Sequence, residues 1–204
     1  MATHFARGIL TEGHLISMRL PSSCHHEARR LPTHRQTRFL ASRGLLAELI
    51  FMLYGTLELP EIVYKAKGKP AFRDKNLPSF SIAYAGNMVG VALTTEGECG
   101  LDMELQRAPR GFISPHTADV PTFSSNESLW ISKQNDPDEA RAQMITLRQS
   151  VLKLTGDVRN NDPHELQLLP VSGRLKCARV AQIEAICDAE DLLVWSVAVT
   201  PAID

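Results

Sequence analysis

Hydrophobic positions three and four residues apart predict two long helices in this chain. The first covers residues 35–53, whose apolar side chains share one helical face, and Gly55 follows as a stop signal. The second begins at the capping residue Asp136, runs to about Leu154 and ends before Gly156. Between and after these helices, the hydrophobic pattern changes to that of strands.

Short β-prone runs predict strands, several with alternating hydrophobic positions, over residues 61–64, 80–84, 88–94, 100–105, 164–171, 180–187 and 192–200. The turn at residues 85–87 joins the second and third of these into a hairpin. Residues 24–34 are polar and His-rich and are predicted to form a loop, and residues 106–122, with three prolines, a linker. Each half of the chain thus holds one long helix and about three strands, which predicts an α+β fold.

The composition adds exclusions. With 204 residues and 44% hydrophobic side chains, the chain is typical of a soluble globular protein. No apolar run is long enough for a bilayer and no secretory core is present, so we expect no membrane partner and a cytoplasmic location. Four scattered cysteines argue against a zinc knuckle or disulfide scaffold, and Cys24 beside two histidines lacks the second ligand pair of a zinc site.

Charge is unevenly distributed, although the net charge is only −1. Residues 1–80 hold 12 Lys and Arg against 6 Asp and Glu, and residues 81–204 hold 10 against 17. This asymmetry suggests that the first part meets an anion, with an unevenly charged solvated surface as the alternative. Aromatic residues are too few, and not interleaved with the basic ones, to indicate nucleic acid.

Two positions carry candidate chemistry. Asp102 and Glu104 alternate with hydrophobic residues, so strand geometry puts both carboxylates on one face. Adjacent carboxylates repel unless a cation lies between them, and Mg²⁺ with oxygen ligands is one solution; two solvated acids are the other. Arg43 falls within the apolar stripe of the first helix, where it must extend to solvent or meet an anion.

The order of several short segments resembles one enzyme family. The segments are residues 38–46, 68–72, 80–87, 100–104, 123–127 and 148–156. They are similar, in this order, to the R-x-x-L-x-x-R-x-L-L helix, G-K-P turn, F-[NS]-[LI]-S-H hairpin, G-[VIL]-D-[VIM]-E strand, F-S-x-x-E element and W-x-x-K-E-A-x-x-K-x-x-G helix of Sfp-like 4'-phosphopantetheinyl transferases. The resemblance implies a pseudo-twofold fold of two similar α/β lobes with an active-site cleft between them, divided here into residues 1–105 and 106–204.

The chain departs from the family pattern where the chemistry is concentrated. The histidine of the first hairpin strand is Tyr84, which keeps a hydrogen-bond donor but loses the cationic option. In the helical motif, tryptophan becomes Ile145, lysine becomes Arg148 and the glutamate becomes Gln149, which offers a carbonyl oxygen but takes no proton. Placing the motif at residues 130–134 instead would restore the tryptophan but lose the final lysine and glycine, so this alternative is rejected.

The resemblance implies Mg²⁺-dependent transfer of 4'-phosphopantetheine from coenzyme A to a serine of an apo acyl or peptidyl carrier protein, releasing 3',5'-ADP. The residue sets that it implies are the metal ligands Asp102, Glu104 and Gln149, the catalytic residues Glu104, Lys153 and Gln149, and the coenzyme A contacts Arg38, Arg43, Lys69, Pro70 and Tyr84. A metal-bound water or Glu104 would have to take the serine proton. We expect a monomer; the alternative is an impaired paralogue that binds coenzyme A or a carrier protein without transfer.

Overall fold

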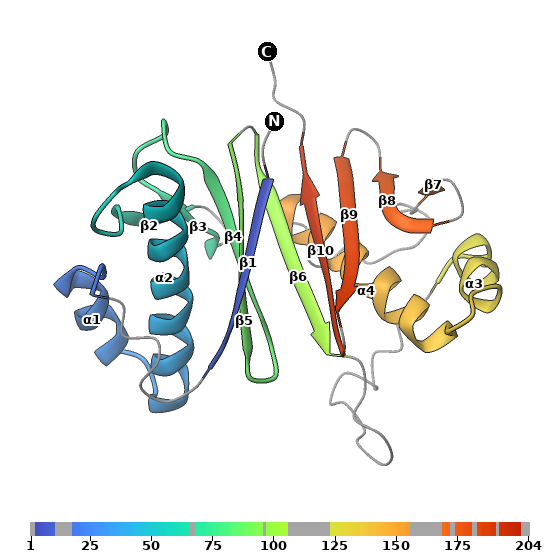
Figure 1. Ribbon diagram of the computed structural model, residues 1–204, viewed down its shortest axis with the longest axis horizontal. Helices are drawn as coiled ribbons and strands as arrows, with labels where there is room; N and C mark the ends of the chain where they lie inside the picture. The colour runs from blue at the N-terminus through green and yellow to red at the C-terminus, as the bar shows by residue number, and fades with distance from the viewer. Residues whose placement is uncertain are drawn as a thin grey trace. The chain divides into compact units, whose positions relative to one another are not determined.

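The computed structural model of the 204-residue chain contains two compact units, residues 1–99 and 100–204 (Figure 1). It describes residues 3–10, 18–65, 68–95, 97–105, 123–155, 169–171, 174–180, 183–190 and 192–200. The predicted linker at residues 106–122 and the stop signal Gly156 lie outside these ranges. Within them the structure is α+β, as the hydrophobic pattern predicted. The predicted two-lobe arrangement of a transferase stays a prediction.

The first unit packs helices on a small antiparallel sheet. Its elements are β1 (Thr3–Ile9), α1 (Ser22–Arg29), α2 (Thr33–Tyr54), β2 (Ile62–Tyr64), β3 (Pro70–Phe72), β4 (Ser79–Ala85) and β5 (Met88–Thr94). The sheet has the order β1-β5-β4, and β2 and β3 form a separate antiparallel pair. The predicted hairpin is confirmed as β4 and β5, which turn at Gly86 with a left-handed φ of 57°.

Helix α2 provides most of the core of the first unit. Leu46 and Ile50 are fully enclosed and pack with Phe80, Val91 and Leu93 of the sheet. The helix ends where predicted, because Gly55 takes a left-handed conformation and its N–H binds the carbonyl of Phe51.

The second unit builds a larger antiparallel sheet. Its elements are β6 (Cys99–Leu105), α3 (Ser125–Ser132), α4 (Pro137–Thr155), β7 (Leu169–Val171), β8 (Arg174–Val180), β9 (Ile183–Glu190) and β10 (Leu193–Val199), and the sheet order is β6-β10-β9-β8-β7. Strand β6, which the sequence placed at the end of the first lobe, pairs with β10 in this sheet. The two compact units divide after Cys99, the first residue of β6.

Helix α4 covers this sheet with an apolar face whose residues recur at three- and four-residue spacing. Met144, Leu147 and Val151 are buried, and they pack against Val194 and other side chains of β9 and β10. The predicted N-cap is also confirmed, because Asp136 Oδ1 accepts a hydrogen bond of 3.1 Å from the N–H of Glu139. Among the described helices, none has the length and apolar composition needed to cross a bilayer.

The prediction of a loop at residues 24–34 was wrong. The segment is helical through Arg29, in α1, and again from Thr33, in α2. Its polar sequence has no helical period of apolar residues, and one small side chain, Ala28, is the part of α1 that is buried. Strand β1 and helix α3 were likewise not predicted, because neither carries a strong hydrophobic period.

Candidate active site

The acidic pair lies on β6, with the alternation that the sequence predicted. Leu101 and Met103 are buried at 0% and 2% exposure, whereas Asp102 and Glu104 are part-exposed. The two carboxylates therefore share one face of the strand, opposite the face that carries Leu101 and Met103. They are also close enough for a hydrogen bond between their side chains.

The surroundings of Asp102 disfavour its charged form in the absence of a cation. Its pKa is raised to about 8, chiefly by enclosure within the protein, and the Glu104 charge and hydrogen bond act in the same direction. The charge of Lys153 acts in the opposite direction. Asp102 Oδ2 is buried and has no hydrogen-bond partner within the described structure. A buried, unpaired acidic oxygen beside a second acid fits a positively charged ligand.

Lys153 lies next to this pair. Its ammonium group donates a hydrogen bond of 2.9 Å from Nζ to the carbonyl of Leu101, the residue before Asp102. The structure thus brings together three of the predicted residues, Asp102, Glu104 and Lys153. Gln149, one turn earlier on α4, is part-buried, and no described contact joins its amide to the acidic pair. Its predicted role as a metal ligand stays a prediction.

The donor set suits a hard divalent cation. Mg²⁺ in proteins is commonly held by one or two carboxylates and keeps several water or phosphate oxygens. Asp102 and Glu104 meet that requirement, and the unpaired Oδ2 supplies an open oxygen. In the described ranges, no group of three His, Cys, Asp or Glu side chains gathers as a closed metal site.

Arg148 occupies the position of the motif's first lysine, but its side chain is buried. Its side chain is 2% exposed, and one guanidinium nitrogen, NH2, lies 2.6 and 2.7 Å from the two carboxylate oxygens of Glu127. Glu127 also completes a capping box at the start of α3, because its Oε1 accepts a hydrogen bond from the N–H of Ser124. Arg148 is thereby held inside the second unit and joins α4 to α3.

Sequence reasoning noted Glu127 as part of an F-S-x-x-E element but did not find this ion pair. The available signal was the coincidence of two charged residues, Glu127 and Arg148, in otherwise apolar helix faces. A buried charge needs a partner of opposite sign, so each could have predicted the other.

In the first unit, the structure brings Arg38 and Tyr84 together. The guanidinium carbon of Arg38 lies 5.5 Å from the centre of the Tyr84 ring. Tyr84 donates a hydrogen bond of 3.2 Å to the Arg38 carbonyl, and Arg38 NH2 lies 3.4 Å from the carbonyl of Gly86. Arg38 is exposed, so its charge faces solvent beside the β4–β5 turn. This placement leaves the guanidinium accessible to an anion.

Arg43 is 7% exposed and lies within the first unit. Its nitrogens donate to Ser42 Oγ at 3.0 Å and to Tyr64 Oη at 3.1 Å, and its charge lies 4.1 Å from the Phe39 ring centre. The Tyr64 hydroxyl in turn donates to Glu27 at 2.6 Å. The sequence left two alternatives for this arginine, extension to solvent or contact with an anion, and the structure shows a third environment. It is held by an aromatic ring and two hydroxyls, with an acid behind one of them.

Lys69 is largely enclosed, and this burial lowers its pKa. Its Nζ donates a hydrogen bond of 2.7 Å to the carbonyl of Cys99. The next residue, Pro70, begins β3 and pairs with Tyr64 across the β2–β3 ladder. Lys69 and Pro70 therefore fix the turn after β2. In the same turn, Lys65 forms an ion pair of 2.8 Å with Glu98.

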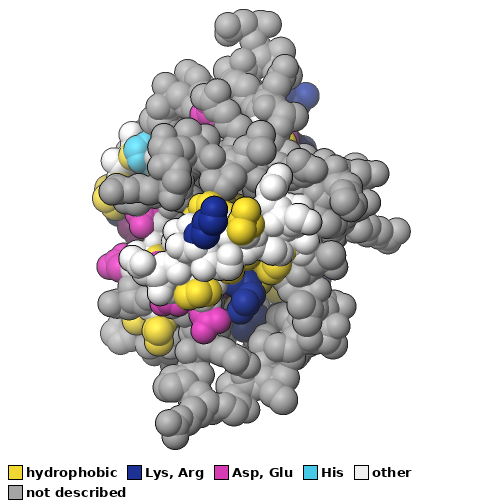
Figure 2. Space-filling view, turned by 90° about the vertical axis from the view of Figure 1, so that its right-hand side faces the viewer, with side chains coloured by type: hydrophobic (Ala, Val, Ile, Leu, Met, Phe, Trp, Pro, Cys, Tyr) yellow, Lys and Arg dark blue, Asp and Glu magenta, His cyan; other side chains and the backbone are white. Residues whose placement is uncertain are grey.

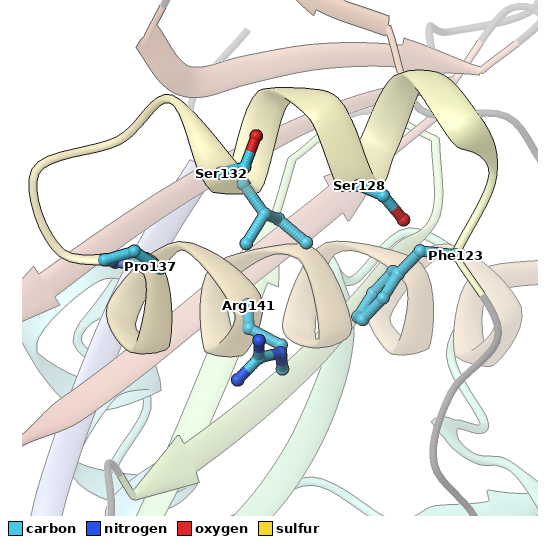
Figure 3. Close-up of a pocket in the computed structure, with 6 residues that line it drawn as sticks. Phe123, Ser128, Ser132, Pro137 and Arg141 are labelled. Atoms are coloured by element: carbon cyan, nitrogen blue, oxygen red, sulfur yellow. The ribbon is translucent and has the colours of Figure 1, made fainter.

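A shallow groove of 360 Å³ lies between α3 and α4. Its lining includes Phe123, Ser128, Ser132, Pro137 and Arg141 (Figure 3). Figure 2 views the side of the molecule on which α3 lies and shows hydrophobic side chains beside basic ones on the described surface. None of the groove residues belongs to the predicted site, and Arg141 already pairs with Asp138 at 3.1 Å.

Comparison with known proteins shows a relative that is similar over the whole of this chain. It is 81% identical to the uncharacterized protein YieE of Escherichia coli K12 over 204 residues, which are all of this chain and 82% of that protein. The chain belongs to the YieE family. A search against protein-family models gave no match.

The YieE-family chain is also distantly similar to named transferases. It is 36% identical over 124 residues to the 4'-phosphopantetheinyl transferase AcpT of Salmonella typhimurium, which is 60% of each chain. It is 35% identical over 88 residues to AcpT of Escherichia coli K12, covering 43% of this chain and 41% of that protein. The chain thus spans about half the length of these transferases. The partial matches support the phosphopantetheinyl transferase superfamily.

Proposed function

We propose that this chain transfers 4'-phosphopantetheine from coenzyme A to a serine of an apo acyl or peptidyl carrier protein in a Mg²⁺-dependent reaction. The observation that carries the proposal is the Asp102–Glu104 pair, in which Asp102 has a raised pKa and an unpaired buried oxygen, with Lys153 beside it. The distant similarity to AcpT transferases supports the same reaction.

The chemistry follows from these side chains. The serine oxygen attacks the β-phosphorus of coenzyme A, the bond from that phosphorus to the bridging oxygen breaks, and 3',5'-ADP leaves. Mg²⁺ held by Asp102 and Glu104 would neutralise charge on the diphosphate. Lys153, whose ammonium lies beside the pair, would stabilise charge that develops on the phosphate oxygens. Glu104 would accept the serine proton, since Gln149 has no basic group, and the Gln149 amide would orient the diphosphate.

The first unit would bind the nucleotide end of coenzyme A. Arg38 is the foremost candidate for the 3'-phosphate, because it is exposed and held over Tyr84. Lys69 and Pro70 would shape the neighbouring turn. Arg43 already donates to Ser42 and Tyr64, so we assign it to supporting this region.

The direct test is intact-mass analysis of purified apo carrier proteins incubated with this chain, coenzyme A and Mg²⁺. A mass gain of one phosphopantetheine group, abolished by chelation of Mg²⁺, is expected. Absence of any gain with carrier proteins of the fatty acid, polyketide and peptide classes would refute transfer.

A second candidate function is coenzyme A binding without transfer. Two observations favour it: Gln149 replaces an acid, and Arg148 is held in the interior by Glu127. Calorimetry showing coenzyme A binding, together with the absence of any mass gain, would select this function over the first.

Arg38→Ala is expected to weaken coenzyme A binding about tenfold or more, because a hydrogen bond to a charged group contributes about 1.5–3 kcal/mol. The measurement is calorimetric titration with coenzyme A and with 3'-dephospho-coenzyme A. Only the affinity for the first should fall. Arg35→Ala, at an exposed arginine one turn earlier on α2, is the matched control. Equal losses for both ligands would contradict the assignment of the 3'-phosphate to Arg38.

Gln149→Glu is expected to raise the transfer rate by about 10²-fold, the lower end of what a positioned general base contributes. The reason is that the substitution adds a proton acceptor beside Lys153 without changing side-chain length. Initial rates of carrier-protein modification measure it, with Gln143→Glu on the same helix as the control for added charge. A rate unchanged or lowered would show that residue 149 takes no part in the proton transfer.

A further inference from the structure

Gly100, the residue where the chain enters the second unit, lies against the backbone of α4. A Cβ atom built at this position would fall on the carbonyl oxygen of Ser150, 2.8 Å from the amide nitrogen of Leu154 and 3.1 Å from Leu154 Cβ. Two of these three atoms are backbone, which side-chain rotation does not move. No other residue type fits this approach of strand to helix without a shift of the backbone.

The close contact of Gly100 with α4 lies next to the acidic pair on β6 and next to Lys153 on α4. Gly100 is two residues before Asp102 on β6, and Leu154 is the neighbour of Lys153 on α4. The residue between Gly100 and Asp102, Leu101, receives the hydrogen bond from Lys153 Nζ at 2.9 Å. The close approach at Gly100 and the Lys153 bond therefore fix the same stretch of β6 on the same turn of α4.

We propose that Gly100 is a positioning residue that holds Asp102 and Glu104 against the α4 turn carrying Lys153. This inference rests on the proposed function for the identity of the bound cation. Adding one methyl group would push β6 off α4, lengthen the Lys153–Leu101 bond and separate the acids from their cationic neighbour. The glycine thus acts indirectly, because the absence of a side chain lets β6 approach α4 closely.

The test uses the full chain with Gly100→Ala, and Gly8→Ala as the matched control. Gly8 is also a strand glycine, in β1, but a Cβ there meets only Val89 Cγ1 at 3.9 Å. The probe is Mn²⁺, whose binding is followed by electron paramagnetic resonance. Gly100→Ala should weaken Mn²⁺ binding by about 10–100-fold, as loss of an outer support of a metal site does, while Gly8→Ala leaves it unchanged. Equal Mn²⁺ affinity in the two folded variants would overturn the proposal.

In the transfer assay, Gly100→Ala should lower kcat and leave the KM for coenzyme A within about twofold, because the nucleotide end is assigned to the first unit. A rise in KM with kcat unchanged would also overturn the positioning role.

If the wild-type chain binds no Mn²⁺, the proposed function loses its metal while the placement of Gly100 is still tested by thermal melting. Both tryptophans, Trp130 and Trp195, lie in the second unit, so their fluorescence reports its unfolding. Lys153→Met should lower the melting temperature of the wild type by more than that of Gly100→Ala, where the bond to Leu101 is already weakened. Additive losses would overturn the proposal.

If Gly100→Ala does not fold, nuclear Overhauser spectra of the wild type decide. The α protons of Gly100 should show strong cross-peaks to the amide proton of Leu154. Their absence would overturn the close approach, and their presence with an unfolded alanine variant supports it.

Discussion

Arg148→Met is expected to lower the free energy of unfolding of the second unit by about 3–5 kcal/mol, the usual effect of removing one partner of a buried ion pair. The substitution keeps the apolar length of the side chain but leaves the Glu127 carboxylate, at 1% exposure, without its cation. It also weakens the capping box of α3, to which the same carboxylate contributes. Urea unfolding followed by tryptophan fluorescence measures the loss.

Two further variants make this prediction specific. Arg141→Met, on the same helix, removes an exposed pair with Asp138 and should cost at most about 1 kcal/mol. Arg148→Met combined with Glu127→Leu should recover part of the lost stability, because no buried charge is then left unpaired. A cost for Arg148→Met no larger than for Arg141→Met would show that the ion pair does not hold α3 to α4.

Asp102→Asn is expected to abolish transfer, with a loss of about 10³-fold or more, while stabilising the metal-free protein at pH 8. The activity falls because one of two carboxylates for Mg²⁺ is gone. The stability rises because the folded pKa of Asp102, about 8, lies above the ordinary value of 3.8. A raised pKa means that folding favours the protonated acid, so this contribution is complete below about pH 4 and is lost as the pH rises through 8.

Melting curves in a chelator at pH 4 and pH 8 test the second half of this prediction. The two proteins should melt alike at pH 4, and at pH 8 the variant should melt higher by about 2–4 °C for each kcal/mol gained. Adding Mg²⁺ at pH 8 should raise the melting temperature of the wild type alone. Asp188→Asn, at an exposed acid of β9, is the control. A wild type that is more stable than Asp102→Asn at pH 8 without metal would contradict the assigned environment.

Much of the fold was predictable where one hydrophobic period dominates. Strand β6 showed its alternation in the sequence, and Met144, Leu147 and Val151 marked the buried face of α4. Helix α1 was missed because its polar sequence buries one side chain, and α3 because its eight residues show no strong hydrophobic period. The surroundings of Ala28 exist only after folding, whereas the capping box of α3 is visible in the sequence as Ser124-x-x-Glu127, a helix-start signal that could have predicted this helix.

The candidate site divides in the same way. The acidic pair was visible because it needs one strand, and Lys153 because it shares a motif with Gln149. The environment of Arg43 was not visible in the sequence, because its partner Tyr64 is 21 residues away. Glu27, which accepts a hydrogen bond from Tyr64, belongs to a segment predicted as loop. The close approach at Gly100 likewise depends on a helix far along the chain, and a glycine in a strand has several ordinary explanations.

The neighbouring positions 148 and 149 on α4 have opposite surroundings. Arg148 is held in the interior by Glu127, whereas Gln149 is part-buried and makes no comparable contact with the residues that the structure describes. The residue at 149 can therefore be exchanged while Arg148 keeps the second unit folded. A chain with glutamate at 149 would keep the same scaffold, because the ion pair of Arg148 with Glu127 does not depend on that side chain.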